Sequence, residues 1–430
     1  MGNQNAGDML DVSTARSMLY RLFDQDTFTE IDRFAMNGEL PCEAVAGFGL
    51  VDGNPVYAFA QNHDVCFGAI GRSQSAKIAK IYALAAQNGA PVIGIFDSDG
   101  ARLGEKLDAM DAIASLLSAS NNISGVVPQI ALIAGSCIGS AAVIAANADI
   151  TVSAGTVDYY LNPGDDNAVV DISAPDLDSA LEQVRKLVAL LPSNNLSTAP
   201  AYDYDISAGE FVSAAEAVCA IADSDSAVAL GCGECKTVLA RVGGTVCGLV
   251  ALIGDGGRVS CCDTARVARF VRMCDGFSVP VISFVDAAGF AGLKCAAKIS
   301  HAYAEATTTK LTVITGQACG AAYIAAAGLA AGADVVLAWP GTVILPMIPE
   351  AAVPVLWKEK WAAVTVPEER DALFSEYTRS EGAAESAAAA GHVTDIVTPA
   401  ETKTKLIALL DMLAGKRISR LPKKHSNIVL

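Results

Sequence analysis

The sequence predicts an α/β protein made of two tandem domains that arose by internal duplication. At 430 residues, the chain is too long for one ordinary core and suits two domains of roughly 100–200 residues each. Apolar residues make up 52% of the chain and charged residues 18%, a balance that excludes a disordered protein. Two segments that recur in the second half of the chain define the architecture.

The longer repeat matches Ala76–Gly100 with Ala265–Gly289 without a gap. Each copy opens with apolar residues at helical spacing and basic residues on another face, which predicts an amphipathic helix. A proline follows, and then a short apolar run of the kind that forms buried parallel strands. Each run ends in an aspartate, Asp97 or Asp286. We expect these side chains to cap the turn that follows, with a functional role at the strand end as the alternative.

The second repeat matches Ile130–Val143 with Leu311–Ile324. Each copy predicts a strand, a glycine-containing turn and a helix of small residues. Both lie in uncharged stretches long enough to cross a bilayer, Val126–Ala148 and Leu311–Ala333, but glycines break them, so we expect no membrane span. A further helix is predicted over Pro367–Ala390, which is rich in Ala and Glu.

A predicted β-hairpin precedes each set of repeats, at Gly47–Asn62 in the first half and at Val238–Gly254 in the second. A hairpin followed by β-α units predicts a layered sheet with right-handed crossovers in each half. Leu191–Ile206 is rich in Pro, Ser, Asn and Asp and has the composition of a linker. We therefore assign residues 1–200 to an N-terminal domain and residues 201–430 to a C-terminal domain.

The formal net charge of −17 argues against a general nucleic-acid binder, because phosphate contacts need a basic face. A polyanionic ligand would need a local basic patch, and the C-terminal tail is one candidate, with a plain solvated tail as an equal alternative. The basic residues of this tail are Lys416, Arg417, Arg420, Lys423 and Lys424. The opening segment Met1–Asp11 carries no secretory signal, so we expect a cytoplasmic protein, with docking to a membrane complex as an option.

Twelve cysteines are scattered along the chain, and reduced thiols are the simplest expectation for a cytosolic protein. Cys232 and Cys235 form one CxxC pair, but a structural zinc site needs four ligands and the sequence has no second pair. We therefore expect no metal in this chain, and we expect Cys261 and Cys262 to be packing residues.

The common catalytic motifs are missing from the sequence, which has no GxSxG elbow, no phosphate-binding loop and only four scattered histidines. The remaining catalytic candidates are two turns, Gly139-Ser140 and Gly320-Ala321-Ala322. Each leaves backbone N–H groups where a strand gives way to a helix, and such groups can hold an anionic oxygen. Glycine admits a ligand close to the backbone. Glycines needed only for packing would give the same pattern, so both interpretations stay open.

The order of several motifs resembles that of the biotin-dependent acyl-CoA carboxyltransferases, from about Ala15 to Leu430. This family includes the β subunit of propionyl-CoA carboxylase and the α subunits of the methylmalonyl-CoA and glutaconyl-CoA decarboxylases. The motifs are DSDGARLGE (Asp97–Glu105), SGVVPQI (Ser124–Ile130), GSCIGSAAV (Gly135–Val143), ARFVRMCDGFSVPVISFVDAAGF (Ala268–Phe290), GQACGAAY (Gly316–Tyr323), AWPG (Ala338–Gly341) and the C-terminal LPKKHSNIVL.

The resemblance implies two tandem crotonase-like domains and two oxyanion holes made of backbone N–H groups. By position, Gly139-Ser140 would hold the enolate oxygen of an acyl-CoA thioester, and Gly320-Ala321-Ala322 would hold the ureido oxygen of biotin. Stabilising the developing enolate charge is then the main catalytic task. In the family, each active site lies between the N domain of one subunit and the C domain of another, which implies a homo-oligomer, either a dimer or a hexamer.

The resemblance also implies a set of substrate-binding residues and partners. Nothing in the sequence resembles a biotin-attachment motif or an ATP-binding domain, so biotin is expected on a separate biotin carboxyl carrier protein. A biotin carboxylase or a membrane decarboxylase subunit would supply or accept the CO2, with a malonyl-, methylmalonyl- or glutaconyl-CoA type of substrate. The candidate substrate-binding residues are Gly68, Ala69, Gly100, Ala101, Arg102, Gly289 and Phe290.

Some positions depart from the family pattern. Glycines are replaced at Asp99, Ser140 and Ala321, and an arginine is replaced at Gly316. The segment Ser153–Asp176 and the segment after Phe290 are shorter than in the family. These changes affect the acyl-CoA pocket, and they motivate two alternatives. One is a non-catalytic scaffold subunit that keeps the fold, and the other is a different crotonase-like acyl-CoA hydrolase or isomerase.

Overall fold

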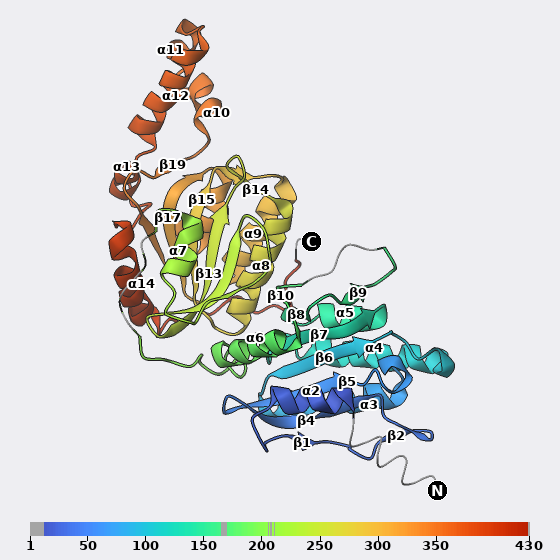
Figure 1. Cartoon of the computed structure of the whole chain (residues 1–430). Coiled ribbons are helices and arrows are strands. Elements are labelled where there is room, and N and C mark those ends of the chain that lie inside the picture. Colours follow the sequence, from blue (N-terminus) through green and yellow to red (C-terminus); the bar gives the residue numbers. More distant parts are fainter. Residues whose placement is uncertain (1–12, 165–169, 205, 207–208, 210, 429–430) are drawn as a thin grey trace. The chain divides into compact units, whose positions relative to one another are not determined.

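The computed structural model describes residues 13–164, 170–204, 206, 209 and 211–428 (Figure 1). The chain divides into two compact units, Met1–Pro200 and Ala201–Leu430. Each unit contains its own large sheet, with helices packed against it.

The sheet of the first unit begins with an antiparallel hairpin and continues with parallel strands. Its order is β1-β4-β5-β6-β7-β8-β10, and β9 also pairs with β7. The hairpin is β4-β5, and every pairing from β5 onward is parallel. The strands are β1 (Thr29–Glu30), β4 (Ala44–Val51), β5 (Asn54–Gln61), β6 (Val92–Ser98), β7 (Gln129–Ile138), β8 (Ile150–Ala154), β9 (Asp158–Tyr160) and β10 (Ile172–Ala174).

The second unit repeats this arrangement strand for strand. Its order is β11-β12-β13-β15-β17-β18-β20, and β19 pairs with β17 as β9 pairs with β7. The duplication predicted from the sequence is therefore present in the sheets. The strands are β11 (Val228–Ala229), β12 (Lys236–Val242), β13 (Thr245–Ile253), β15 (Val281–Ala287), β17 (Lys310–Cys319), β18 (Val335–Ala338), β19 (Val343–Leu345) and β20 (Asp395–Ile396).

Both predicted hairpins form, and their turns have the same geometry. Asp52 and Gly53 have φ values of +49° and +78°, and Gly243 and Gly244 have φ values of +59° and +75°. Two successive positive φ values make the turn type that matches the twist of the flanking strands, and Asp-Gly and Gly-Gly are the pairs that adopt it readily. The hairpins therefore follow from local sequence.

The parallel strands of the first unit are buried under helices. Helix α3 (Arg72–Asn88) packs on the sheet, and α4 (Leu107–Asn122) packs on α3. The core includes Phe59, Phe96 and Ile133, none of them more than 3% exposed. Burying a side chain of this size contributes about 1.5–3 kcal/mol, so the apolar strand runs account for most of the local stability.

The second unit has the matching helix pair. Helix α8 (Cys261–Gly276) packs on β13, and α9 (Leu293–Glu305) packs on α8. Leu249, Phe284 and Val313 lie in the core and are fully buried. The two units thus bury equivalent helices and strands.

The two uncharged stretches of the sequence form strands, turns and short helices, as predicted. The first becomes β7 and α5 (Ser140–Ala146), and the second becomes β17, the π-helical turn η3 (Tyr323–Ala327) and the 3-10 turn η4 (Leu329–Ala331). Within the described ranges, no helix combines the length and the apolar character needed to cross a membrane.

The predicted helix over Pro367–Ala390 is only partly correct. It forms as two helices, α12 (Pro367–Glu381) and α13 (Ala384–Ala389), separated at Gly382 and Ala383. Ala383 is extended and forms a β-bridge with Val343. Pairing with a distant strand therefore overrides the local helix propensity at this point.

The expectation of uniformly reduced thiols is wrong for one pair, because Cys261 and Cys295 form a disulfide across 34 residues of sequence. Cys261 is thus not a simple packing residue, and Cys262 is exposed. Cys235 of the CxxC pair is buried, and its Sγ donates to the carbonyl oxygen of Ile253 at 3.3 Å. Among the described residues, no three His, Cys, Asp or Glu side chains are grouped as a metal site requires.

Candidate active site

Both candidate turns follow a long strand that changes partner along its length. Strand β7 pairs with β8 as far as Ile133 and with β9 from Ser136. Strand β17 likewise pairs with β18 as far as Ile314 and with β19 from Gln317. The end of each long strand is therefore held by a short strand of its own.

In the first unit, Gly139 makes the turn between β7 and α5, with φ +60° and ψ −120°. This backbone conformation favours glycine. The N–H of Gly139 donates to the carbonyl oxygen of Tyr160 in β9 at 3.0 Å, so Gly139 is not itself a free donor. The first N–H groups of a helix have no intrahelical acceptor, so the donors of this turn are those of Ser140 and the next residue.

The side chain of Ser140 adds a further polar group to the first turn. Its hydroxyl oxygen is buried and has no hydrogen-bond partner among the residues that the structure describes. A buried hydroxyl without a partner is costly, so it indicates a place where a bound oxygen atom would complete the hydrogen bonding.

In the second unit, Gly320 has the corresponding place, with φ +48°. Its N–H donates to the carbonyl oxygen of Leu345 in β19 at 2.9 Å. Ala321 and Ala322 follow, and then the predicted helix of small residues begins as η3, a π-helical turn. Such turns are frequent at functional sites. The two candidate turns therefore share one construction.

Asp97 supports the first turn from the neighbouring strand. Its Oδ1 accepts a hydrogen bond from the N–H of Ser136 in β7 at 3.1 Å. A Cβ on Gly135 would lie 2.5 Å from the same oxygen, so a larger residue there would displace this carboxylate. The prediction that Asp97 caps its own turn is therefore wrong. Burial raises the pKa of Asp97, and the nearby Asp99 and Asp64 carboxylates raise it further.

Gly68 and Ala69, from the loop after β5, lie beside the carboxyl end of β6. Gly68 has φ +64°, and a Cβ there would lie 2.2 Å from the carbonyl oxygen of Asp97. The buried side chain of Gln74 donates to the Gly68 carbonyl at 3.0 Å. A close backbone approach therefore accounts for this glycine, and its role in substrate binding stays a prediction.

Gly100 and Ala101 lie beside the first candidate turn. A Cβ on Gly100 would be 3.0 Å from the carbonyl oxygen of Ile138, the residue before Gly139. The N–H of Gly100 donates to the hydroxyl of Ser98 at 3.1 Å, so a serine caps this turn. Backbone from two segments far apart in sequence therefore meets at one edge of the sheet.

Arg102 is engaged by two carboxylates within the protein. Its guanidinium pairs with the fully buried Glu43, and its Nε lies 3.6 Å from Glu105. Nδ2 of Asn37 donates to both carboxylates, at 2.9 and 3.0 Å. Burial alone would raise the pKa of Glu105, but hydrogen bonds from Asn37 and the Arg72 N–H, with the charge of Arg102, hold this pKa below its ordinary value. The positive charge of Arg102, which was expected to bind the substrate, is therefore compensated by two carboxylates of the protein.

Gly289 and Phe290 form strand β16, which pairs in parallel with β14 (Arg258–Val259). The N–H of Gly289 donates to the carbonyl oxygen of Gly257 at 3.0 Å. A Cβ on Gly257 would lie 3.5 Å from Nε2 of Gln317 in β17. These residues therefore lie near the strand that ends in the second candidate turn.

One side-chain pair at the first site was not anticipated from the sequence. Nε2 of His63 lies 3.6 Å from Oδ1 of Asp99, and the ring of Phe67 packs edge-on against His63. Asp99 was visible as a departure from the family pattern, but no local pattern links it to His63. The pairing depends on the loop after β5 folding back over the end of β6.

The thiols nearest to the two turns are unsuited to nucleophilic attack. Burial raises the pKa of Cys137, which lies two residues before Gly139, and the charge of Asp97 raises it further. Burial likewise raises the pKa of Cys319, which precedes Gly320. Thiols that stay protonated react poorly. The two turns therefore offer backbone donors and not thiolate nucleophiles.

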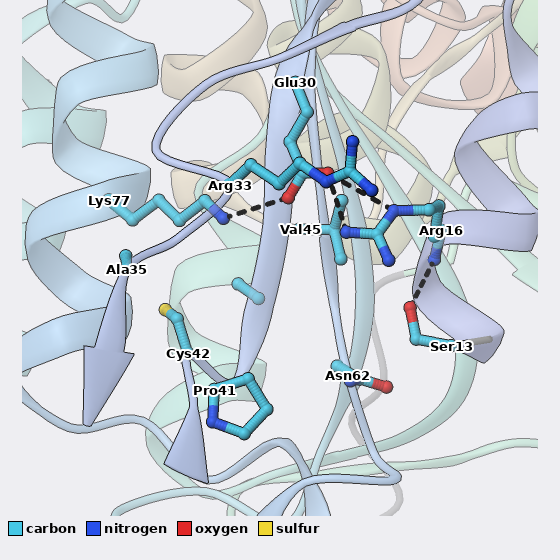
Figure 2. A pocket seen from close by; sticks show the side chains of 11 residues that line it. Ser13, Arg16, Glu30, Arg33, Ala35, Pro41, Cys42, Val45, Asn62 and Lys77 are labelled. Carbon is cyan, nitrogen blue, oxygen red and sulfur yellow. Dashed lines mark hydrogen bonds and ion pairs between the residues drawn. The ribbon is translucent and has the colours of Figure 1, made fainter. Parts of the chain in front are cut away.

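A small pocket elsewhere in the first unit contains buried charges (Figure 2). Arg16 of α2 (Thr14–Leu22) and Lys77 of α3 both point toward Glu30 of β1 and pair with it, at 2.6 and 3.4 Å. The cavity has a volume of about 10 Å³, room for about one water molecule. It is too small for an acyl-CoA, and its charges serve to tie two helices to the sheet.

The basic tail folds back on the second unit. Nζ of Lys416 donates to Asp334 at 2.7 Å, and Lys423 pairs with Glu305. Arg420 donates to a backbone carbonyl oxygen at 2.9 Å. Internal partners therefore engage these three cations, so the tail is neither a plain solvated segment nor a fully free basic patch.

Residues 12–158 and 164–428 match the carboxyl transferase domain family. The chain belongs to this family. The resemblance to the biotin-dependent acyl-CoA carboxyltransferases is thus confirmed, and the chain is an enzyme of that class.

Relatives of this carboxyltransferase cover nearly its whole length. The methylmalonyl-CoA decarboxylase α subunit of Veillonella parvula is 32% identical, over 97% of this chain and 93% of the relative. A putative propionyl-CoA carboxylase β chain of Bacillus subtilis is also 32% identical, over 97% and 94%. The methylmalonyl-CoA carboxyltransferase 12S subunit of Propionibacterium freudenreichii subsp. shermanii is 30% identical, over 96% and 91%.

A solved structure agrees with these relatives. The transcarboxylase 12S hexamer with hydrolysed methylmalonyl-CoA bound aligns with a TM-score of 0.90 at 30% identity, over 98% of this chain and 94% of that one. The predicted fold class, two tandem crotonase-like α/β domains related by duplication, is therefore confirmed.

Proposed function

We propose that this carboxyltransferase moves a carboxyl group between a methylmalonyl-type acyl-CoA and biotin on a separate carrier protein. The observation that carries the proposal is the matched pair of turns at Gly139 and Gly320, each built at the same place in one copy of the duplicated sheet. Each unit thus offers backbone donors to one ligand oxygen. The names of relatives that act on methylmalonyl-CoA support this choice of acyl group.

In this proposal the first turn binds the thioester oxygen of the acyl-CoA. Loss of the carboxyl group from a malonyl-type thioester leaves an enolate, whose negative charge lies largely on that oxygen. The N–H groups at the start of α5 would stabilise this charge, and each such donor contributes about 2.7–4 kcal/mol to the transition state. The buried hydroxyl of Ser140, which has no partner among the described residues, supports the assignment, because it is one more donor on the same turn.

In this proposal the second turn binds the ureido oxygen of biotin. Biotin supplies a ureido nitrogen that carries the carboxyl group, and its ureido oxygen needs hydrogen-bond donors. The N–H of Gly320 donates to the carbonyl oxygen of Leu345. The donors left for a ligand are therefore the N–H groups of Ala321 and Ala322. A Cβ on Gly320 would lie 3.1 Å from the carbonyl oxygen of Pro346, which favours glycine at this position. Backbone donors leave the turn free of side chains that would block the ring.

We also propose that the chain works as a homo-oligomer, because it exposes a run of large apolar side chains. Leu103, Leu107 and Met110 are 86%, 73% and 63% exposed in the first unit. Neighbouring exposed apolar residues mark interaction surfaces, and the similar 12S structure is a hexamer. The other proposed partners are a biotin carboxyl carrier protein and a biotin carboxylase or membrane decarboxylase subunit, which would place the enzyme in the cytoplasm or at a membrane complex.

A decarboxylation assay tests the proposal. The purified chain is mixed with malonyl-, methylmalonyl- or glutaconyl-CoA, with and without free biotin, and the acyl-CoA products are followed by mass spectrometry. We expect biotin-dependent conversion of methylmalonyl-CoA to propionyl-CoA. Equal turnover without biotin would indicate a different crotonase-like enzyme. A folded oligomer that neither turns over nor binds any of the three would be a scaffold subunit.

A further inference from the structure

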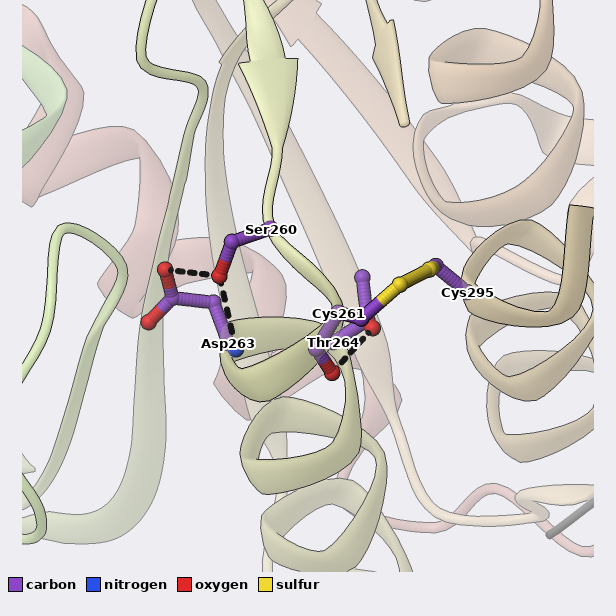
Figure 3. Close-up of a disulfide and its surroundings, with 5 residues drawn as sticks. All are labelled: Ser260, Cys261, Asp263, Thr264 and Cys295. Carbon is purple, nitrogen blue, oxygen red and sulfur yellow. Dashed lines mark hydrogen bonds between the residues drawn. A yellow bond between two sulfur atoms is a disulfide. The ribbon is translucent and has the colours of Figure 1, made fainter. Parts of the chain in front are cut away.

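A disulfide joins the starts of two helices beside the candidate site of the second unit (Figure 3). Cys261 is the first residue of α8, and Cys295 is the third residue of α9. Their Cα atoms are 5.1 Å apart. The disulfide therefore links the N-terminal ends of the two helices, just after strands β14 and β16.

The disulfide lies directly against the segment that contains Gly289 and Phe290. The N–H of Ala291 donates to the carbonyl oxygen of Val259 at 2.9 Å, which extends the pairing of β16 with β14. A Cβ on the next residue, Gly292, would lie 3.5 Å from Sγ of Cys295 and 3.8 Å from Sγ of Cys261. The disulfide therefore packs against the backbone of the segment that leads from β16 into α9.

The two sulfur atoms lie in different surroundings. Cys261 is exposed, whereas Cys295 is 2% exposed. Helix α8 begins with a capping serine and carries Asp263 in its first turn. Helix α9 begins without a capping side chain and has no acidic residue in its first turn. An incoming thiolate can thus reach Cys261. The start of α9, which carries no acidic residue, partly offsets the cost of burying the thiolate that leaves from Cys295.

The other cysteines show that this bond is not part of a disulfide scaffold. The remaining ten are free, and Cys219, Cys232 and Cys262 among them are exposed. A chain kept stable by disulfides in an oxidising compartment would not leave so many thiols exposed to exchange. A single disulfide among free thiols is more typical of a reversible, redox-sensing bond.

We propose that Cys261 and Cys295 form a reversible thiol–disulfide exchange site that holds the Gly289–Phe290 segment in place when it is oxidised. The reaction partner is a dithiol reductant. One of its thiolates attacks Sγ of Cys261, the bond to Cys295 breaks, and Cys295 leaves as a thiolate and takes up a proton. The second thiol of the reductant then displaces Cys261 and forms the reductant's own disulfide. The protein gains two electrons and two protons, and a disulfide oxidant reverses the reaction.

Redox titration of the full chain tests this site. The protein is equilibrated in buffers of reduced and oxidised dithiothreitol, alkylated, and mapped by peptide mass spectrometry. Hydrogen exchange is measured in parallel on the peptide that spans Ala287–Ala296. We expect Cys261 and Cys295 to change state together and reversibly, and we expect exchange in this peptide to rise by about tenfold or more on reduction, because a local cross-link is lost.

Matched variants separate the site from general thiol effects. The double variant C261S/C295S should show fast exchange in both buffers, and C262S, which removes the exposed neighbouring thiol, should behave as the wild type. The proposal is overturned if the pair stays reduced in the most oxidising buffer, if it stays oxidised in the most reducing one, or if wild-type exchange is the same in both states. None of these readouts involves acyl-CoA or biotin, so they are independent of the proposed reaction.

Discussion

The carboxylate of Asp286 accepts a hydrogen bond from the backbone N–H of Gln317 at 3.0 Å. Asp97 and Ser136 make the same contact in the first unit, at 3.1 Å. A Cβ on Gly316 would lie 2.3 Å from Oδ1 of Asp286, so the glycine that departs from the family pattern makes room for this carboxylate. In both units an aspartate therefore holds the long strand at the point where it changes partner, and so positions the turn that follows.

Substituting Asp97 should separate its hydrogen bond from its charge. D97A should lower the free energy of unfolding by about 1–3 kcal/mol, because the N–H of Ser136 loses its acceptor. Because burial raises the pKa of Asp97, its contribution to stability falls as pH rises from the unfolded to the folded pKa. D97N keeps an acceptor and removes the charge, so it should be at least as stable as the wild type at pH 7. Urea unfolding measures both variants, and equal losses would contradict this account.

Gly139 should be essential to catalysis because its backbone conformation places the donors of the first turn. G139A should lower kcat/KM for decarboxylation by about 10²–10³, because it displaces the donors of the first turn. G53A is the matched control, since Gly53 also has positive φ and, at both positions, no atom of the described residues lies within 4 Å of an added Cβ. Both variants should lose stability to a similar extent, of order 1–3 kcal/mol. An equal loss of activity in both would remove the first turn from the mechanism.

Gly320 should affect the biotin side of the reaction more than the acyl-CoA side. G320A places a Cβ 3.1 Å from the carbonyl oxygen of Pro346 and should shift the donors of the second turn. We expect a larger rise in KM for biotin than for the acyl-CoA, measured with free biotin as the varied substrate. G341A is the control, because Gly341 has φ +80° and an added Cβ there would meet no atom of the structurally described chain within 4 Å. Normal use of biotin by G320A would contradict the assignment.

The hydroxyl of Ser140 should contribute to catalysis and not to stability. It has no hydrogen-bond partner within the described part of the chain, so S140A should leave the melting temperature nearly unchanged. If the hydroxyl donates to the enolate oxygen, kcat should fall by about 10²–10³-fold, the effect of removing one oxyanion donor. Steady-state kinetics on methylmalonyl-CoA measure this. An unchanged kcat would leave the first turn with backbone donors alone.

The contribution of Lys310 to the free energy of unfolding should increase as the pH becomes alkaline. Burial lowers the pKa of Lys310 from 10.5 to about 8, and the charges of Lys416 and Arg420 lower it further in the same direction. Between these pH values the unfolded chain binds a proton that the folded chain lacks, so this contribution to stability increases with pH, by at most about 1.4 kcal/mol per pH unit. The difference in unfolding free energy between wild type and K310M, measured from pH 7.5 to about 10.5, isolates the effect. A flat difference would show that Lys310 titrates normally.

The sequence by itself determined the repeated elements of this protein. The apolar runs and the Asp-Gly and Gly-Gly turns each span only a few residues. They predict strands, helices and hairpins because backbone preferences and burial patterns act locally. The duplication and the order of the motifs then identified the family and located the turns at Gly139 and Gly320. Each of these features depends on residues that are neighbours in the chain.

Only the tertiary structure decided what those turns offer chemically. The N–H of Gly139 is bonded to Tyr160, the charge of Arg102 is matched by Glu43 and Glu105, and His63 lies beside Asp99. Such contacts arise when folding brings distant segments together, and no local pattern records them.

The same holds for the disulfide between Cys261 and Cys295, and for the break at Gly382 in a helix that the local composition favours. In each case a contact between residues far apart in sequence adds to the local conformational preference or overrides it. Local propensities amount to a few tenths of a kcal/mol per residue, whereas packing and pairing between distant segments contribute more, so sequence patterns determine the elements and tertiary contacts determine the chemistry of the site.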